Sequence, residues 1–135
     1  MKQSVAPTIF VVFGITGDLA QRKIIPALFN LYKESMLPQK FRIIGFSRRD
    51  WDQNRFKKYI RAVVRERVSR APKKTLEKFL SCLVFEKGYF EDIKCYRKLH
   101  ETLKALDINI GVCANKLFHL AVPASSYETD RKSVV

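Results

Sequence analysis

The chain has 135 residues, which is enough for one compact domain but leaves no room for a second sizeable one. Its hydrophobic content of 47% is that of a globular protein, and no apolar run reaches the roughly 18 residues that a membrane-spanning helix needs. The 26 Lys and Arg outnumber the 13 Asp and Glu, and the net charge of +13 favours a polyanionic ligand such as nucleic acid, a membrane surface or a phosphorylated small molecule.

Strands and helices alternate along the chain. Short apolar runs predict strands at Ile9–Phe13, at Phe41–Ser47, from Leu83 to a stop at Gly88, and at Lys116–Val122. Helical spacing of apolar residues predicts helices at Leu19–Ser35, at Asp52–Arg70, from Pro72 and at Ile93–Leu106, with the start of another from Ser125. Pro26 predicts a late start or a kink in the first helix, and Asp50 or Asp52 is expected to cap the second.

The strands are apolar on both faces, as in a parallel sheet covered by helices. We therefore expect an α/β fold, a partial Rossmann-like doubly wound parallel sheet with helices on both faces. Residues 1–135 are expected to form this single domain. Four strands are fewer than the six of the full dinucleotide-binding arrangement.

The turn "GITGD" joins the first strand to the first helix. It lies at the carboxyl end of the strand, which is where parallel sheets bind their ligands. Gly14 permits a tight turn, and Gly17 lets an anion approach the backbone at the helix start. Thr16 offers a hydroxyl donor, whereas Asp18 is expected to cap the helix because two negative groups would repel. The spacing is GxxG and not the general GxGxxG fingerprint, so an ordinary strand-to-helix turn remains the alternative.

The second strand ends in "GFSRRD", with two arginines directly after Ser47. An acidic residue at this place is typical of NAD binding, and an arginine suits the 2′-phosphate of NADP. Arg48 and Arg49 can grip phosphate and stack on adenine, so they favour NADP. Solvated surface charge is the alternative interpretation of the pair.

Four stretches together resemble one family. "FGITGDLAQRKIIPALFNLY" is similar to the coenzyme motif of glucose-6-phosphate dehydrogenases, and "IIGFSRRDW" is similar to that family's second strand. "GYFEDIKCYRKL" and "ANKLFHLAVPASSYE" resemble segments at the third and fourth strands. The resemblance is collinear from about Thr8 to Glu128. It implies NADP as cofactor and glucose 6-phosphate as substrate, oxidised to the lactone in the pentose phosphate pathway.

The resemblance also implies roles for single residues. The family's diphosphate loop falls on Gly14, Ile15, Thr16, Gly17, Asp18 and Leu19. Its 2′-phosphate arginine falls on Arg48, and Arg49 takes the neighbouring position that faces adenine. Lys23 matches a lysine that contacts the sugar phosphate; a surface lysine is the alternative. His119 replaces a tyrosine beside the coenzyme, with a buried strand histidine as the alternative.

The chain departs from the family in length, because members are several times longer. Their substrate lysine motif, their catalytic histidine–aspartate pair and their large antiparallel-sheet domain have no counterpart here. We therefore expect no catalytic residue in this chain, which resembles the front portion of such an enzyme. We expect it to be inactive alone. A fragment that pairs with a full-length or complementary subunit, or regulates it, is a further alternative.

The remaining residues point to no other chemistry. Two histidines and three scattered cysteines predict no metal site, and the odd cysteine count with no N-terminal signal sequence favours a cytoplasmic protein. The competing class is a non-enzymatic basic binding or regulatory module that uses the many Lys and Arg between 52 and 74. The simpler interpretation of these residues is a solvated basic face. Nucleic-acid binding, the alternative, would show a steep salt dependence.

Overall fold

The structure is a computed structural model that describes residues 6–88 and 93–120. Its elements, in chain order, are strand β1 (Thr8–Phe13), the π-helical turn η1 (Ala20–Ile24), helix α1 (Ile25–Lys33), strand β2 (Phe41–Ser47), helices α2 (Gln53–Arg67) and α3 (Lys73–Leu80), strand β3 (Leu83–Lys87), helix α4 (Ile93–Ile110) and strand β4 (Asn115–Leu120). The helix expected from Ser125, and the end of the strand expected to reach Val122, lie outside the described residues.

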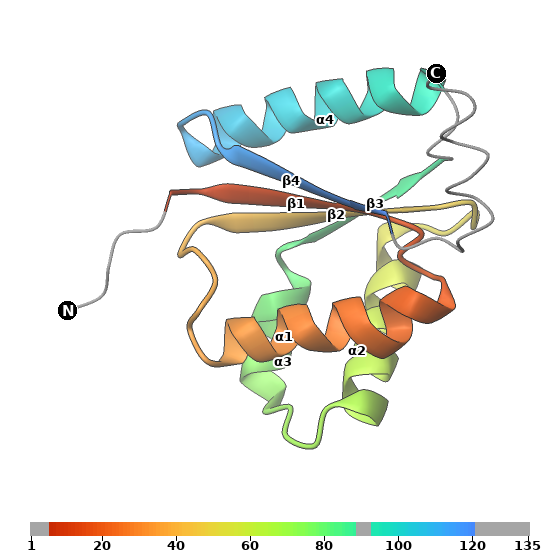
Figure 1. The fold of residues 1–135 in the computed structure, drawn as a ribbon, viewed down its shortest axis with the longest axis vertical. Coiled ribbons are helices and arrows are strands. Elements are labelled where there is room, and N and C mark those ends of the chain that lie inside the picture. The colour runs from red at the N-terminus through yellow and green to blue at the C-terminus, as the bar shows by residue number, and fades with distance from the viewer. Residues whose placement is uncertain (1–5, 89–92, 121–135) are drawn as a thin grey trace.

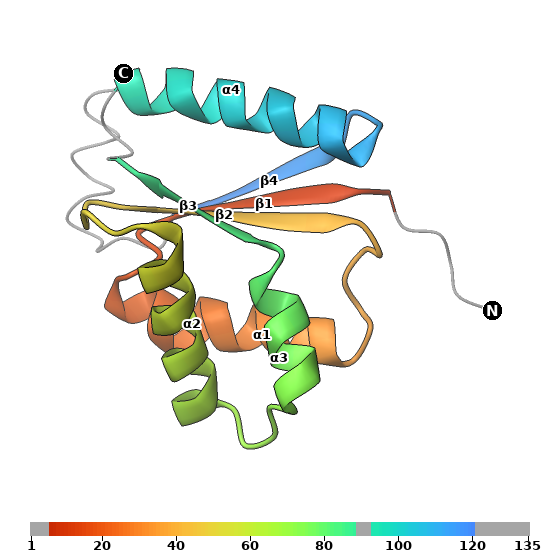
Figure 2. The same cartoon turned by 180° about the vertical axis from the view of Figure 1, so that it is seen from behind.

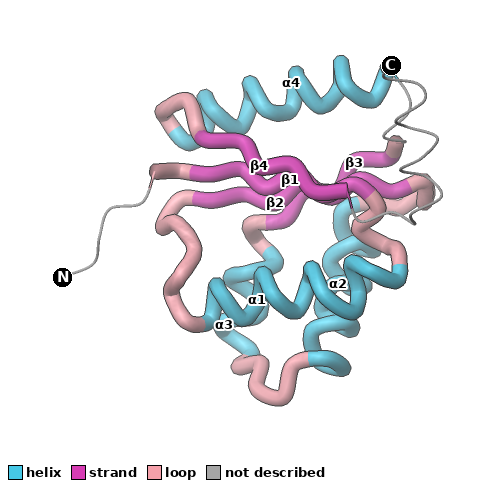
Figure 3. The backbone as a smooth tube through the Cα atoms, viewed as in Figure 1, coloured by secondary structure: helices cyan, strands magenta, loops and turns pink. Residues whose placement is uncertain are grey.

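The four strands form one parallel sheet in the order β3-β2-β1-β4 (Figure 3). The chain first adds β2 and β3 on one side of β1 and then returns to place β4 on the other side. This reversal puts a topological switch point between β1 and β4, where open α/β sheets bind their ligands. The predicted doubly wound α/β fold is confirmed.

Helices cover both faces of the sheet. Helices α1, α2 and α3 lie on one face and α4 lies alone on the other, as the two opposite views show (Figures 1 and 2). Successive strand residues point to opposite faces, so Val12 belongs to the core under α1 while Val11 and Phe13 belong to the core under α4. Burial on both faces explains why the strands are apolar throughout.

Several element ends differ from the sequence expectation for local reasons. The first helix begins as the irregular turn η1, and Pro26 lies in the first turn of α1, where its missing N–H is not needed. Helix α4 extends to Ile110, four residues beyond the expected end. Gly111 follows it at a φ of 94°, a left-handed conformation that glycine adopts at little cost. None of the helices in residues 6–88 and 93–120 is long and apolar enough to cross a bilayer.

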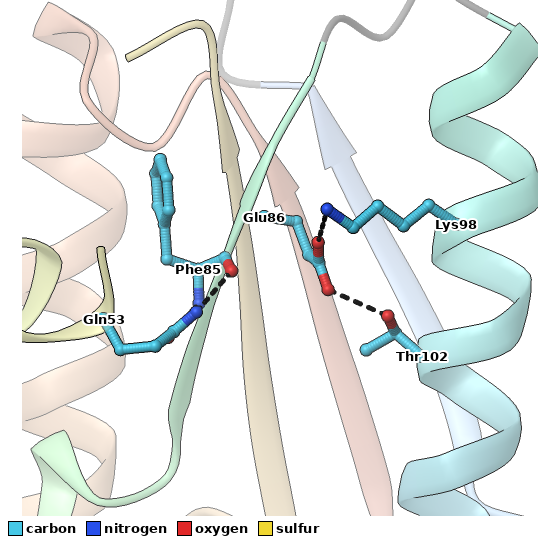
Figure 4. Close-up of polar contacts among 5 residues, drawn as sticks. All are labelled: Gln53, Phe85, Glu86, Lys98 and Thr102. Carbon is cyan, nitrogen blue, oxygen red and sulfur yellow. Dashed lines mark hydrogen bonds and ion pairs between the residues drawn. The ribbon is translucent and has the colours of Figure 1, made fainter. Parts of the chain in front are cut away.

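Strand β3, at one edge of the sheet, is fixed by side chains from both faces (Figure 4). The Gln53 side-chain amide donates to the Phe85 carbonyl and accepts from the Phe85 N–H, both at 2.8 Å. On the α4 side, the buried Glu86 carboxylate accepts a hydrogen bond from Thr102 at 2.9 Å and pairs with Lys98 at 3.2 Å. Polar groups therefore join this edge strand to α2 and to α4.

Candidate functional site

The candidate site lies at the carboxyl edge of the sheet. The turn of residues 14–18 follows β1, and Arg48 and Arg49 follow β2. Because β1 and β2 are parallel and Phe13 pairs with Phe46, the two loops leave the sheet side by side. The structure thus brings together the two sequence motifs that predicted the site.

Backbone hydrogen bonds fix the turn after β1. Gly14 has a φ of 80°, so the conformational freedom expected of this glycine is used. The amides of Gly14 and Ile15 both donate to the Phe46 carbonyl, at 2.9 and 3.0 Å. The Gly17 amide donates to the Gly14 carbonyl at 3.0 Å, which closes the turn before the helix begins.

Ile15 anchors the turn through its side chain, which is only 1% exposed. It packs over Gly45 of β2, where an added Cβ would lie 2.9 Å from Ile15 Cγ1 and 3.0 Å from Phe56 Cζ. Such contacts are shorter than packed carbon atoms tolerate. Gly45 is therefore required for the close approach, and Ile15 can face a ligand only through its backbone.

Thr16 links the two loops. Its hydroxyl forms a hydrogen bond of 2.7 Å with the Ser47 hydroxyl, and Ser47 Oγ also accepts from the Arg49 amide at 3.1 Å. The sequence predicted Thr16 as a phosphate donor only. The structure adds a second role, because Ser47, which is 4% exposed, ties the glycine turn to the arginine loop.

Asp18 does not cap the helix, so this expectation is wrong. Its carboxylate pairs with Arg22 one helical turn later, at 3.0 Å, and both side chains are largely exposed. The residue at the cap position of η1 is Leu19, which offers no side-chain hydrogen bond. Leu19 is 40% exposed beside the turn. The pairing with Arg22 offsets the negative charge that Asp18 would present to a phosphate.

In the loop after β2, the aspartates have partners other than the arginine side chains. Arg48 and Arg49 are exposed, and the Asp50 carboxylate lies 3.7 Å from Lys87 Nζ at the end of β3. Asp52, not Asp50, caps α2 by accepting from the Arg55 amide at 2.7 Å. Each of the two aspartates therefore has a partner other than the arginine side chains.

Tyr59 supports the turn from α2. Its hydroxyl donates to the Ile15 carbonyl at 3.3 Å. Burial raises the pKa of Tyr59 to about 12, although a hydrogen bond with Gln21 and the charge of Arg49 act in the opposite direction. The phenol consequently stays protonated at neutral pH and remains a hydrogen-bond donor.

Lys23 lies on η1, and His119 lies on β4. Lys23 is exposed on η1, and His119 is exposed on β4, so the alternative of a buried strand histidine is wrong. His119 lines a groove of about 270 Å³ between the β1–β4 edge and η1–α1, together with Val12, Ile24 and Leu117. The groove lies next to the switch point, and its lining is mainly apolar.

The sequence analysis did not single out four residues at or near the two loops: Ser47, Trp51, Arg55 and Tyr59. Trp51 was the easiest to find, because it is the only tryptophan of the chain and follows the arginines by two positions. Arg55 lies three residues after the Asp52 cap, a spacing that places it in the first turn of α2. Ser47 and Tyr59 act through contacts with the distant turn and leave no local sequence signal.

A glycine turn at the switch point of a parallel sheet, next to exposed arginines, defines the class: a Rossmann-type nucleotide-binding domain. The family model described as glucose-6-phosphate dehydrogenase, NAD binding domain, matches residues 11–134. The chain therefore belongs to the glucose-6-phosphate dehydrogenase family and comprises its coenzyme-binding portion.

Curated relatives agree with this assignment. The chain is 36% identical over 123 residues to glucose-6-phosphate 1-dehydrogenase 2 of Mycobacterium bovis and 36% identical over 118 residues to the glucose-6-phosphate 1-dehydrogenase of Chlamydia pneumoniae. These matches cover 90% and 87% of this chain but 24% and 23% of the relatives. The chain thus spans about a quarter of the length of these relatives.

Solved structures show the same fold. A glucose-6-phosphate dehydrogenase in complex with its substrate glucose-6-phosphate superimposes with a TM-score of 0.78 at 26% identity, covering 93% of this chain and 26% of that one. The glucose-6-phosphate 1-dehydrogenase of Mycobacterium avium gives a TM-score of 0.73 at 24% identity, over 87% and 24% of the two chains. The second likeness concerns the fold alone.

Proposed function

We propose that this chain binds NADP as the coenzyme-binding portion of a glucose-6-phosphate dehydrogenase, in the cytoplasm. One observation carries the choice of NADP over NAD: Arg48 and Arg49 directly follow β2, and the Thr16–Ser47 hydrogen bond of 2.7 Å ties their loop to the glycine turn. An arginine here suits a 2′-phosphate, whereas an acidic residue would suit a free ribose hydroxyl. The domain is proposed to comprise residues 1–135.

The donor set fits a phosphorylated dinucleotide. Residues 14–19 would hold the diphosphate through the turn and the start of the helix. Arg48 would grip the 2′-phosphate, and Arg49 would face the adenine. Because Ser47 Oγ already accepts from the Arg49 amide, it can donate its proton to Thr16. Thr16 then keeps its own proton to donate to a coenzyme phosphate.

The nicotinamide half would lie toward β4. Lys23 on η1 would contact the sugar phosphate of glucose 6-phosphate, and His119 would lie beside the coenzyme. NADP⁺, when bound, supplies the hydride acceptor, and the residues of this chain bind and orient it. The two histidines of the chain are on opposite sides of the sheet, since His100 is on α4 and His119 lines the groove beside α1. They cannot form one acid–base site together.

Calorimetric titration with NADP⁺, NAD⁺ and a short DNA duplex tests the proposal. We expect NADP⁺ to bind at least tenfold more tightly than NAD⁺, and we expect Arg48→Ala to remove that preference. Arg67→Ala is the matched control, because it deletes an exposed arginine at the far end of α2. Equal affinity for both coenzymes, or DNA binding without NADP⁺ binding, would overturn the proposal in favour of a basic binding module.

One of the basic residues between 52 and 74 has a structural role, which argues against a basic binding module. The Arg61 guanidinium donates two hydrogen bonds to the Glu77 carboxylate, at 3.0 and 2.9 Å, and thereby joins α2 to α3. This contact lowers the pKa of Glu77 below its usual range. We also expect the purified chain to produce no NADPH from glucose 6-phosphate and NADP⁺; measurable turnover would contradict the assignment of a binding role alone.

A further inference from the structure

Two arginines from different elements lie close to the ring of Trp51. The Arg49 Cζ is 6.0 Å from the centre of the indole ring, and the Arg55 Cζ is 5.1 Å from it. Arg49 belongs to the loop after β2, and Arg55 belongs to the first turn of α2. Both distances are within the range at which a guanidinium is attracted to an aromatic face.

The indole is itself held in place. Its ring centre is 5.2 Å from that of Tyr59 and 6.2 Å from that of Phe85, and Trp51 is half-buried. The backbone of Arg55 is held at the start of α2, because its amide donates to the Asp52 carboxylate at 2.7 Å. The Trp51 ring therefore packs on two other aromatic side chains, and the guanidinium groups of Arg49 and Arg55 lie near it.

A guanidinium near an aromatic ring can still use its N–H edge for hydrogen bonds. Arg48 and Arg49 directly follow β2 in the chain, and Arg55 joins Arg49 beside the Trp51 ring. The nearby Asp50 carboxylate lies 3.7 Å from Lys87 at the end of β3. A phosphate monoester that carries nearly two charges is the natural ligand of such a set.

We infer that Arg55 is a second specificity-determining residue for the 2′-phosphate of NADP, and that Trp51 is the positioning residue that holds Arg49 and Arg55 at the loop after β2. This inference rests on the proposed function. It adds Arg55 of α2 to the two arginines of the sequence motif as a residue that discriminates between NADP and NAD.

The test measures the ratio of NADP⁺ to NAD⁺ affinity by calorimetry in Arg55→Ala, Arg48→Ala and Arg67→Ala. We expect Arg55→Ala to weaken NADP⁺ binding about tenfold and to leave NAD⁺ binding unchanged, as for one lost charge-assisted hydrogen bond. The matched control Arg67→Ala lies 12 positions further along α2, roughly 18 Å away along the helix, and should change neither affinity. An Arg55→Ala variant with the wild-type ratio would overturn the inference.

Two further variants separate positioning by Trp51 from simple packing. Trp51→Phe keeps an aromatic face and should retain most of the NADP⁺ preference, whereas Trp51→Leu should lose it while both proteins keep the same circular dichroism spectrum. Equal ratios in the two variants would contradict the role of the ring. If Arg48→Ala alone alters the ratio, the inference fails and the proposed function stands; if Arg48→Ala also leaves it unchanged, the proposed function fails.

Discussion

The two edges of the sheet are built differently. At the β3 edge, Gln53 satisfies both backbone groups of Phe85, and Glu86 is enclosed by Lys98 and Thr102. At the β4 edge, Leu117 and Phe118 are 55% and 57% exposed, and the apolar groove opens beside them. Within residues 6–88 and 93–120, the outer side of β4 pairs with no strand.

This difference separates the two halves of the proposed coenzyme site. The two arginines after β2 and the glycine turn belong to the β1–β2–β3 side, where Ser47, Tyr59 and Trp51 support them. His119 belongs to the β4 side, whose apolar surface remains exposed. We therefore propose that the adenosine half is recognised where hydrogen bonds join the two loops, and that the nicotinamide half lies beside the exposed β4 edge.

The largest difference between the core and the β4 edge is expected when one phenylalanine in each is replaced by alanine. Phe56, under the turn, is fully buried, whereas Phe118 on β4 is 57% exposed. We expect Phe56→Ala to lower the free energy of unfolding by about 3–5 kcal/mol, and Phe118→Ala to change it by less than about 1 kcal/mol. Urea unfolding followed by circular dichroism measures both. Similar losses would mean that the β4 edge is packed as tightly as the core.

Gln53 tests how the β3 edge is closed. Gln53→Ala leaves the Phe85 N–H and carbonyl without their partner, and we expect a loss of about 1–3 kcal/mol. The neighbouring exposed residue provides the control, since Asn54→Ala lies on the same turn of α2 and should have little effect. Hydrogen exchange at Phe85 should accelerate only in the Gln53 variant. Unchanged protection there would contradict the edge-closing role.

The smallest change in stability is expected from Asp107, which is hydrogen-bonded to Lys116 of β4. Hydrogen bonds from Lys116 at 2.7 Å and from the Ala114 amide at 2.9 Å hold the pKa of Asp107 below its usual value. A lowered native pKa stabilises the fold above the unfolded value of about 3.9, and this contribution is lost as the pH falls through the native pKa. The urea midpoints of wild type and Asp107→Asn should therefore differ at pH 6, and the difference should shrink from about pH 4 downward until the pH is below the lowered native pKa of Asp107. A difference that persists in acid would point to packing in place of charge.

Periodicity predicted most of the fold because the strands are short, apolar and separated by clear helices. β2 begins and ends where expected, and β1 differs by one residue, since pairing of Thr8 with Phe41 extends it. Helix ends were harder to predict, as the extension of α4 to Ile110 shows. Its stop at Gly111 is a local backbone feature that apolar spacing does not reveal.

The candidate site was predictable only in its outline. Gly14 and Arg48 stand in recognisable local patterns, and their adjacency follows from parallel strands. The Thr16–Ser47 bond joins residues 31 positions apart, and the Gln53–Phe85 contact joins residues 32 apart. Such contacts depend on the packed fold, and no local pattern encodes them. The Asp18 expectation failed because Arg22, one turn later, competes for its carboxylate.

The most direct test of the central claim uses the adenosine half of the coenzyme alone. Titration of the chain with adenosine 2′,5′-bisphosphate and with adenosine 5′-monophosphate isolates the 2′-phosphate, and the fluorescence of Trp51, the only tryptophan, reports binding at this loop. The account predicts that the bisphosphate binds at least tenfold more tightly and changes the Trp51 emission. Equal affinities, or binding that leaves the emission unchanged, would contradict it.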